Sequence, residues 1–272
     1  MKRFKRHYRN MEKINSEYVY DRYIETIKRR FIYSNCYFHK EDLNEWIKEG
    51  LVQCYCSEDC FVLVLQKCGF IKLYFLSNSF DWTSKLNEIK KHAGDSEIAI
   101  EIVTRGKLDD YDLRRYCLFK KMIQYDRLRS KGIEINEKDE HPSYCKQADF
   151  MQLRVMIDET FSSIGDYIPS DKELTGFLDG KNIICARDRD KIEGFIIFED
   201  KGKTSYVRMV CVNKDSRGRG IGESLMRMYF AIHQEYKGFT LWCKSDNVPA
   251  MRLYEKVGQY NDEDIHNYIF VL

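Results

Sequence analysis

The sequence predicts a two-part α/β (α+β) protein whose second half is a mixed, mostly antiparallel sheet flanked by helices. The chain has 272 residues, more than the roughly 100–200 that one typical domain needs. Short runs rich in Ile and Val alternate with amphipathic stretches of helical spacing, which is the pattern of a mixed α/β layer. Hydrophobic residues make up 43% of the chain and aromatic residues 14%, enough to fill hydrophobic cores.

The first half is predicted to hold helices and strands in mixed order. Gly50 and Gly94 are suitable helix ends, and Asp81 can cap the helix that ends at Gly94. We expect helices over 17–30, 41–50, 81–92 and 109–129, a hairpin of strands over 60–65 and 70–76, and a strand over 97–103.

The second half has the clearer pattern. One predicted helix carries apolar residues at steps of four, three and four, which makes a core-facing stripe: Ile221, Leu225, Met228 and Ile232. We expect helices over 147–161, 171–178, 220–236 and 249–258, and strands over 182–186, 193–198, 205–212, 239–243 and 267–272.

A charged segment, 131–141, separates the two halves and ends at Pro142. We interpret it as a linker, although Ile133 and Ile135 could form a short strand there. The predicted domains are therefore an N-terminal α/β domain over 1–135 and a second domain over 142–272.

Charge and cysteine content narrow the class of partner. The net charge is +2, so nothing general draws the chain to nucleic acid or to a membrane surface. The basic start, 1–10, can touch a polyanion or form a solvated helical turn. No apolar run approaches the ~20 residues of a membrane helix, and no signal peptide is recognised. Ten cysteines in a chain without an export signal favour a cytoplasmic protein with free thiols, and their spacing predicts no metal site.

A glycine-rich segment, 217–222, follows a predicted strand and opens a predicted helix. Backbone amides in such a loop converge, and the helix N-terminus adds partial positive charge, so a phosphate or pyrophosphate is the expected guest. A plain strand-to-helix turn is the alternative for this loop alone. The Gly-Lys-Ser/Thr ending of a P-loop is missing, and the glycine spacing does not fit a dinucleotide fold.

Two motifs together resemble the GNAT superfamily of N-acetyltransferases. Arg217-x-x-Gly220-x-Gly222 is similar to the pyrophosphate-binding signature of that family. Downstream, Asn247 is followed by a helix that carries Leu253-Tyr254 and ends at Gly258, which resembles the family's second motif. The resemblance covers about 142–272 and implies a GNAT-like fold there.

The resemblance also implies how acetyl-CoA is bound as acetyl donor. The strand before the glycine loop is expected to splay from the strand after the helix, and the pantetheine arm to lie between them. Backbone groups of one strand would bind pantetheine, amides of the loop the pyrophosphate, and two arginines would add charge. The implied cofactor-binding residues are Val210, Cys211, Val212, Arg217, Gly218, Arg219, Gly220, Ile221, Gly222, Glu223, Ser224 and Asn247.

Tyr254 is the implied general acid, because a phenol can protonate a CoA thiolate leaving group. The alternative for Tyr254 is an amphipathic core residue. The strand before the glycine loop carries no carboxylate, so the general base stays open, with Glu199 and Asp166 as candidates that act through water. A ping-pong route through Cys211 or Cys243 is set aside, because strand cysteines usually serve packing.

The sequence thus predicts an acetyl-CoA-dependent N-acetyltransferase that acts on an amine-bearing small molecule or peptide, and a homodimer is an option that the sequence leaves open. A CoA-binding regulatory protein without turnover is the alternative. The N-terminal half is either a degenerate copy of the same fold, with Ser77–Trp82 in place of a glycine loop and Phe119 in place of Tyr254, or an unrelated α/β domain.

Overall fold

The computed structural model describes residues 12–13, 25, 33–36, 38–56, 60–67, 69–77, 86–110, 113, 116, 118–133, 143–258 and 260–272. The chain divides into two compact units. Unit 1 consists of Met1–Thr104, Leu108–Ile123 and Tyr268–Leu272, and unit 2 of Arg105–Lys107 and Gln124–Asn267. None of the helices within the described ranges is both long and apolar enough to cross a membrane.

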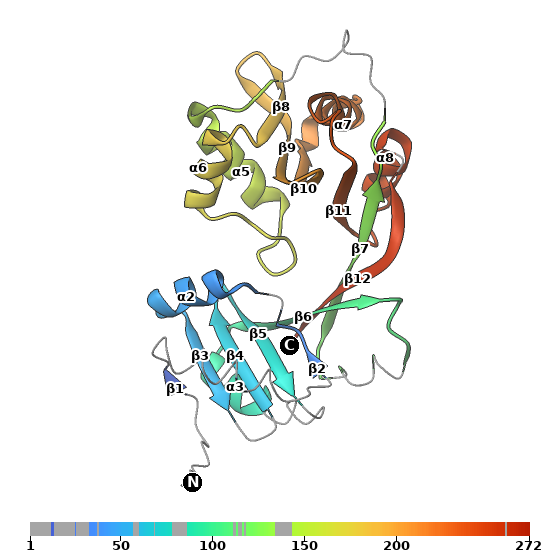
Figure 1. Ribbon diagram of the computed structural model, residues 1–272. Helices are drawn as coiled ribbons and strands as arrows, with labels where there is room; N and C mark the ends of the chain where they lie inside the picture. The colour runs from blue at the N-terminus through green and yellow to red at the C-terminus, as the bar shows by residue number, and fades with distance from the viewer. Residues whose placement is uncertain are drawn as a thin grey trace, which may run out of the picture. The chain divides into compact units, whose positions relative to one another are not determined.

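Unit 1 is built around a sheet with the strand order β1-β3-β4-β5-β6 (Figure 1). Successive residues of β4 alternate between two hydrophobic clusters, one on each face of the sheet. Helix α2 belongs to one cluster and helix α3 to the other. The elements are β1 (Glu12–Lys13), β2 (Tyr33–Ser34), α2 (Lys40–Lys48), β3 (Val52–Cys56), β4 (Cys60–Gln66), β5 (Phe70–Ser77), α3 (Leu86–Ala93) and β6 (Glu97–Arg105).

Unit 2 has the strand order β12-β7-β11-β10-β9-β8. Helices α7 and α8 pack on one face of its sheet, while α5 and α6 pack on the other. The elements are β7 (Lys121–Ser130), η2 (Gln147–Asp149), α5 (Phe150–Thr160), α6 (Asp171–Asp179), β8 (Ile183–Asp188), β9 (Lys191–Lys201), β10 (Thr204–Val212), η3 (Lys214–Ser216), α7 (Ile221–Ile232), β11 (Gly238–Lys244), α8 (Val248–Gly258) and β12 (Asn261–Val271).

Most strands of unit 2 pair antiparallel, with one parallel exception. Pairs β8–β9, β9–β10 and β7–β11 are antiparallel, while β10 and β11 are parallel and joined by α7. The predicted fold class, a mixed and mostly antiparallel sheet flanked by helices, is therefore confirmed.

The predicted helix over 109–129 is wrong at its C-terminal end. Residues 121–130 form β7, which pairs with β11 from Tyr125 opposite Lys244 to Ser130 opposite Phe239. This segment has helical spacing, but its pairing with β11, more than 100 residues away in the sequence, makes it a strand. Local propensity does not reflect such a distant contact.

The pairing of β7 with β11 explains why the boundaries of the compact units differ from the predicted domain boundaries at 135 and 142. Residues 124–133 belong to unit 2 with β7, and residues 268–272 belong to unit 1. Whether 1–135 and 142–272 act as separate domains stays a prediction. The expected helix over 17–30 lies outside the described residues except for Glu25, and so does most of the expected linker.

Most of the other predicted elements agree with the structure within a few residues, while the start of the predicted helix over 81–92, with Asp81, lies outside the described residues. Helix α7 ends at Ile232 instead of 236, and β12 begins at Asn261, six residues before the predicted start. Both differences concern element ends, where local sequence is least informative.

Candidate active site

Strands β10 and β11 pair with each other along only part of their length. Their parallel register runs only from Thr204 opposite Gly238 to Val207 opposite Leu241. Strand β10 continues to Val212 and β11 to Lys244, each still paired with its outer neighbour. The inner edges of 208–212 and 242–244 therefore do not pair with each other, and the two strands form a V that opens toward the glycine loop.

A bulge marks the vertex of this V. The register of β10 against β9 shifts between Val207 and Met209, so Arg208 is the extra residue. A bulge bends its strand and ends regular pairing locally. The bulge thus accounts for the departure of β10 from β11.

The glycine loop has the geometry that the sequence predicts for an anion site. Gly218 and Gly220 have φ values of 76° and 80°, a region that L side chains rarely adopt, and a Cβ at either position would meet open space. Gly220 is the N-cap of α7 and offers no side-chain cap. The first bond of the helix runs from the Ser224 amide to the Gly220 carbonyl, 3.0 Å, so the amides of Ile221, Gly222 and Glu223 have no partner within the helix.

The loop is fixed to β9 through a buried carboxylate that sequence reasoning missed. Glu193 accepts hydrogen bonds from the Ser216 hydroxyl at 3.1 Å and from Arg219. The Arg219 side chain is still 58% exposed. Arg217 donates from Nε to the Val212 carbonyl at 3.2 Å. Both arginines thus lie beside the loop, and each already donates a hydrogen bond to the protein, Arg219 to Glu193 and Arg217 to the Val212 carbonyl.

The loop is also held close to α8. A Cβ on Gly222 would lie 3.0 Å from the Leu253 side chain, so a larger residue there would require that side chain to shift by a few tenths of an ångström. Glu223 accepts from Lys256 of α8 at 2.8 Å and from Arg227 at 3.3 Å. The hydrogen bond from Lys256, followed by that from Arg227, lowers the pKa of Glu223. These cations offset the charge of a carboxylate that would otherwise repel a phosphate.

The three predicted pantetheine contacts, Val210, Cys211 and Val212, lie in the part of β10 beyond its last pair with β11. The side chains of Val210 and Val212 pack toward α7, while that of Cys211 is buried toward α5 and lies 3.4 Å from the Thr160 hydroxyl. The inner edge itself is thus backbone only. On this edge Arg217 donates to the Val212 carbonyl.

Tyr254 lies near the splayed part of β11. It is 7% exposed and packs edge-on against Tyr260, with ring centroids 5.8 Å apart. Burial raises the pKa of Tyr254, and the nearby Cys243 raises it further. The phenol therefore stays protonated, the form that a general acid requires. Asn247 accepts a hydrogen bond from the Ala250 amide at 3.3 Å and caps α8.

The two predicted bases both have cationic partners. Asp166, on the loop after α5, accepts from Lys244 at 3.0 Å and from the Tyr125 hydroxyl at 2.8 Å. Glu199, on β9, accepts twice from Arg208, each at 3.3 Å. Glu199 stands opposite Tyr206, beside the vertex of the V, so it is the carboxylate next to the place where β10 and β11 separate.

Both cysteines of the discarded ping-pong route are poor nucleophiles. Burial raises the pKa of Cys211, despite a hydrogen bond with Thr160, and raises the pKa of Cys243 to about 12. Because the thiolate is the reactive form, these thiols suit packing better than catalysis.

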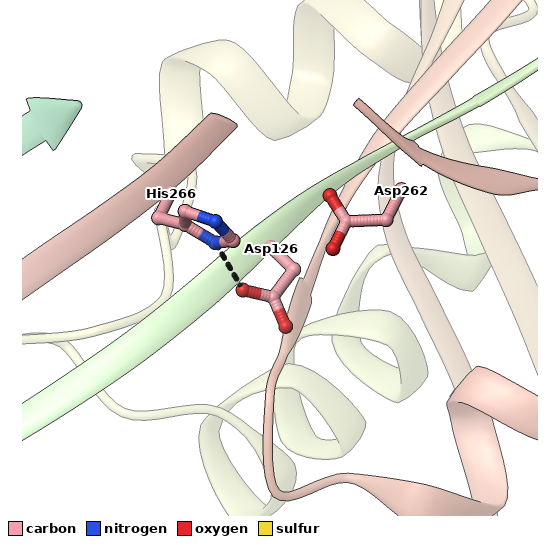
Figure 2. A group of neighbouring side chains, drawn as sticks. All are labelled: Asp126, Asp262 and His266. Atoms are coloured by element: carbon pink, nitrogen blue, oxygen red, sulfur yellow. Dashed lines mark hydrogen bonds and ion pairs between the residues drawn. The ribbon is translucent and has the colours of Figure 1, made fainter. Parts of the chain in front are cut away.

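A second polar cluster lies on β7 and β12, where Asp126 stands opposite Cys243 of β11. Asp126, Asp262 and His266 hold ligand-type atoms within 4.8 Å of one another (Figure 2). The Asp126 carboxylate, however, already bonds His266 at 2.7 Å and Gln124 at 2.9 Å, and the other ring nitrogen of His266 lies 3.3 Å from Asp264. We interpret the cluster as a hydrogen-bond network that joins two strands.

Unit 1 contains a similar parallel pair, but its inner edge is filled. Strands β5 and β6 pair only from Phe70 opposite Glu97 to Leu73 opposite Ile100. Beyond that point β2 pairs with β5 at Leu76 and Ser77. Since β4 occupies the other edge of β5 at those residues, β2 lies on the edge that faces β6.

Asn35 completes this filling of the β5 edge. It is fully buried, and its amide donates to the Phe75 carbonyl at 3.2 Å. Its side chain donates to the Leu73 carbonyl at 2.9 Å and accepts from the Phe75 amide at 2.6 Å. In unit 1 the chain itself thus bonds the backbone groups of β5 that lie beyond its last pair with β6.

Comparison with known proteins agrees with this geometry. Residues 179–258 match the family model of the acetyltransferase (GNAT) domain. The sequence has no significant match among curated proteins.

Several solved structures share the fold. A GCN5-related N-acetyltransferase from Sphaerobacter thermophilus is 14% identical, with a TM-score of 0.57 over 85% of this chain and 84% of its own. A GNAT-family acetyltransferase from Colwellia psychrerythraea is 12% identical, with a TM-score of 0.52 over 97% and 99%. A tandem GNAT protein from the clavulanic acid biosynthesis pathway is 7% identical, with a TM-score of 0.58 over 97% and 98%.

At these identities the solved structures show a common fold, and the family match lies on the segment that carries the V, the glycine loop and α8. Residues 179–258 thus match a GNAT acetyltransferase domain, and the chain shares the fold of solved GNAT acetyltransferases.

Proposed function

We propose that the protein transfers an acetyl group from acetyl-CoA to an amine by direct attack, and that unit 2 binds the donor. The observation that carries this proposal is the free inner edge of 208–212, which leads to an uncapped helix N-terminus at Gly220. Pantetheine carries amides that can pair with a strand edge, and pyrophosphate suits converging backbone amides. One continuous surface thus matches both parts of one donor.

The residues predicted for the donor divide along this surface. Backbone groups of Val210, Cys211 and Val212 would hold the pantetheine arm. The amides from Gly218 to Glu223 would hold the pyrophosphate, with Arg217 and Arg219 adding charge at the rim and Ser224 and Asn247 as neighbouring contacts. The cations that neutralise Glu223 support this assignment, since they remove a local repulsion.

The chemistry requires an acid and a proton acceptor. The amine nitrogen attacks the thioester carbon, the C–S bond breaks, and the departing thiolate takes the phenolic proton of Tyr254, which solvent later restores. The proton lost by the amine passes through water to Glu199, the carboxylate beside the vertex. Tyr254 lies near Cys243 on the splayed part of β11, as this role requires.

The acceptor is an amine-bearing small molecule or peptide. A cytoplasmic location and a homodimer belong to the proposal as well. The location is supported by the described cysteines, which are free thiols: Cys36, Cys54, Cys60, Cys145, Cys185, Cys211 and Cys243.

Two measurements on the intact protein test the proposal. Calorimetric titration with acetyl-CoA is expected to show binding, and a thiol-release assay with a panel of amines is expected to show turnover. Binding without release of thiol from any amine would favour the alternative, a CoA-binding regulatory protein. Absence of binding would remove the site assignment itself.

A further inference from the structure

The bulge residue Arg208 lies where the acceptor must approach. The donor arm enters the V from the glycine loop, so its reactive end reaches the vertex at Val207 and Arg208. The acceptor then has to come from the side of the vertex away from the glycine loop. The inference below rests on the proposed function.

The Arg208 guanidinium lies close to two aromatic rings. It lies 4.3 Å from the ring centroid of Tyr167 and 5.8 Å from that of Tyr206. Tyr167 comes from the loop after α5 and is 62% exposed. Stacking of this kind fixes the plane of a guanidinium and leaves its edge available for hydrogen bonds.

Within the described residues, few of the hydrogen-bond donors on the edge of the Arg208 guanidinium have a partner. Within the described part of the chain, the hydrogen-bond partner of Arg208 is Glu199, reached from one nitrogen, Nη1, at 3.3 Å to each carboxylate oxygen. Charge-assisted pairs normally close to about 2.7–2.9 Å, and a guanidinium offers five donors. Arg208 is 18% exposed as a side chain, so its remaining donors are oriented but accessible to a small anion.

The neighbouring charges select the kind of anion. Glu199 touches Arg208, and Asp166 next to Tyr167 is already neutralised by Lys244. A phosphate dianion would bring excess negative charge beside Glu199, whereas a carboxylate adds a single charge. An α-amino acid also carries an ammonium group on the same carbon, so its two charges can address two protein groups that are only 3.3 Å apart.

We infer that the acceptor is an amine of the α-amino-acid class, and that Arg208 binds its carboxylate while Glu199 receives its amino group. Binding exchanges the loose Arg208–Glu199 pair for two pairs with the substrate. The exchange places the attacking nitrogen beside the carboxylate that takes its proton. Arg208 is thus a specificity residue, and the donor site does not depend on it.

The test compares amino acids with their carboxamides, which keep the amine and lose the negative charge. For each pair, kcat/KM is measured by thiol release with saturating acetyl-CoA. The ratio of acid to amide is then compared between wild type and Arg208→Met, so that differences in intrinsic amine reactivity cancel. Arg208→Lys and the distant turn variant Arg189→Met are measured in parallel.

We expect wild type to prefer the acids, and Arg208→Met to lower the acid-to-amide ratio by about 10- to 100-fold, mainly through KM, as the loss of hydrogen bonds to a charged group implies. Arg208→Lys should retain an intermediate ratio and Arg189→Met the wild-type ratio. Calorimetric affinity for acetyl-CoA should be unchanged in all three variants.

The inference is overturned if wild type acetylates amides as well as acids, if none of the amino acids is acetylated although acetyl-CoA binds, or if Arg208→Met leaves the ratio unchanged. Failure of wild type to bind acetyl-CoA is a different result, because it removes the proposed function and not only this choice of acceptor.

Discussion

Units 1 and 2 contain the same splayed pair of parallel strands and use it differently. In unit 1 the register of β5 and β6 ends at Leu73, and in unit 2 that of β10 and β11 ends at Val207. In both units the two strands are joined through a helix, α3 or α7. The backbone beyond the last pair is then an unpaired strand edge, which must find hydrogen-bond partners if it is buried.

The two units differ in what bonds to that strand edge. In unit 1 the chain supplies it, since β2 and Asn35 bond to Leu73, Phe75, Leu76 and Ser77. In unit 2 no described strand pairs with the inner edge of 208–212, and a helix N-terminus without a side-chain cap follows it. A strand edge can receive a ligand only where the chain leaves it unfilled.

The largest expected effect concerns the acid that unit 2 supplies. Tyr254→Phe should lower kcat by roughly 10²–10⁴-fold, the usual worth of general acid catalysis, with little change in acetyl-CoA affinity. Steady-state kinetics together with calorimetry measure both quantities. Tyr260→Phe is the matched control, because the Tyr260 hydroxyl is buried in the same cluster and finds no partner in the described residues. Equal kcat for the two variants would make Tyr254 a core residue.

A second prediction concerns the loop that unit 2 adds to the common strand pair. Gly220→Glu should weaken acetyl-CoA binding by about 100-fold or more, because a carboxylate then stands among the amides meant for pyrophosphate. Gly202→Glu is the control, since Gly202 in the β9–β10 turn has a similar positive φ of 61° and equally open surroundings. Calorimetry on folded protein decides between them. Undiminished binding by Gly220→Glu would contradict the assignment of the loop.

A third prediction concerns the filled edge of unit 1. Asn35→Ala removes a side chain that satisfies two buried backbone groups, so it should lower the free energy of unfolding by about 2–4 kcal/mol. Asn44→Ala, at an exposed position of α2, should change it by less than about 0.5 kcal/mol. Urea unfolding followed by circular dichroism measures both. Similar stability of the two variants would show that Asn35 is not needed to close the edge.

The smallest expected effect is the absence of a fall in kcat at high pH. Because burial raises the pKa of Tyr254, its acid form persists above the ordinary tyrosine value of about 10. The kcat profile should therefore rise as the acceptor amine deprotonates and show no descending limb below pH 10. A descending limb near pH 8 or 9 that is absent from Tyr254→Phe would instead place the pKa of Tyr254 below its ordinary value.

Local sequence was sufficient for the second half of the chain because its signals are local. The stripe on α7 predicts a buried helix face, and Gly220 predicts a turn that side-chain-bearing residues disfavour. Asn247 predicts the start of α8, where its side chain indeed bonds the Ala250 amide. Each of these features depends on neighbours within a few residues.

Other features depend on partners that are distant in sequence. The segment 121–130 has helical spacing and becomes a strand only because β11 lies beside it. Arg208, Tyr167 and Glu199 come from three elements, and no single segment marks them as a group. The same is true of Glu193, which anchors the glycine loop from a neighbouring strand.

The sequence by itself determined the fold class and most elements of unit 2, and it predicted a loop for a pyrophosphate, because periodicity, caps and glycine conformations act over a few residues. Only the tertiary structure decided which strand edges are filled and which stay open. That choice depends on hydrogen-bond partners up to about 40 residues away within unit 1, and on a pairing register between β10 and β11 that ends at a bulge. Backbone groups are the same in every residue, so their availability is a property of packing and not of residue type.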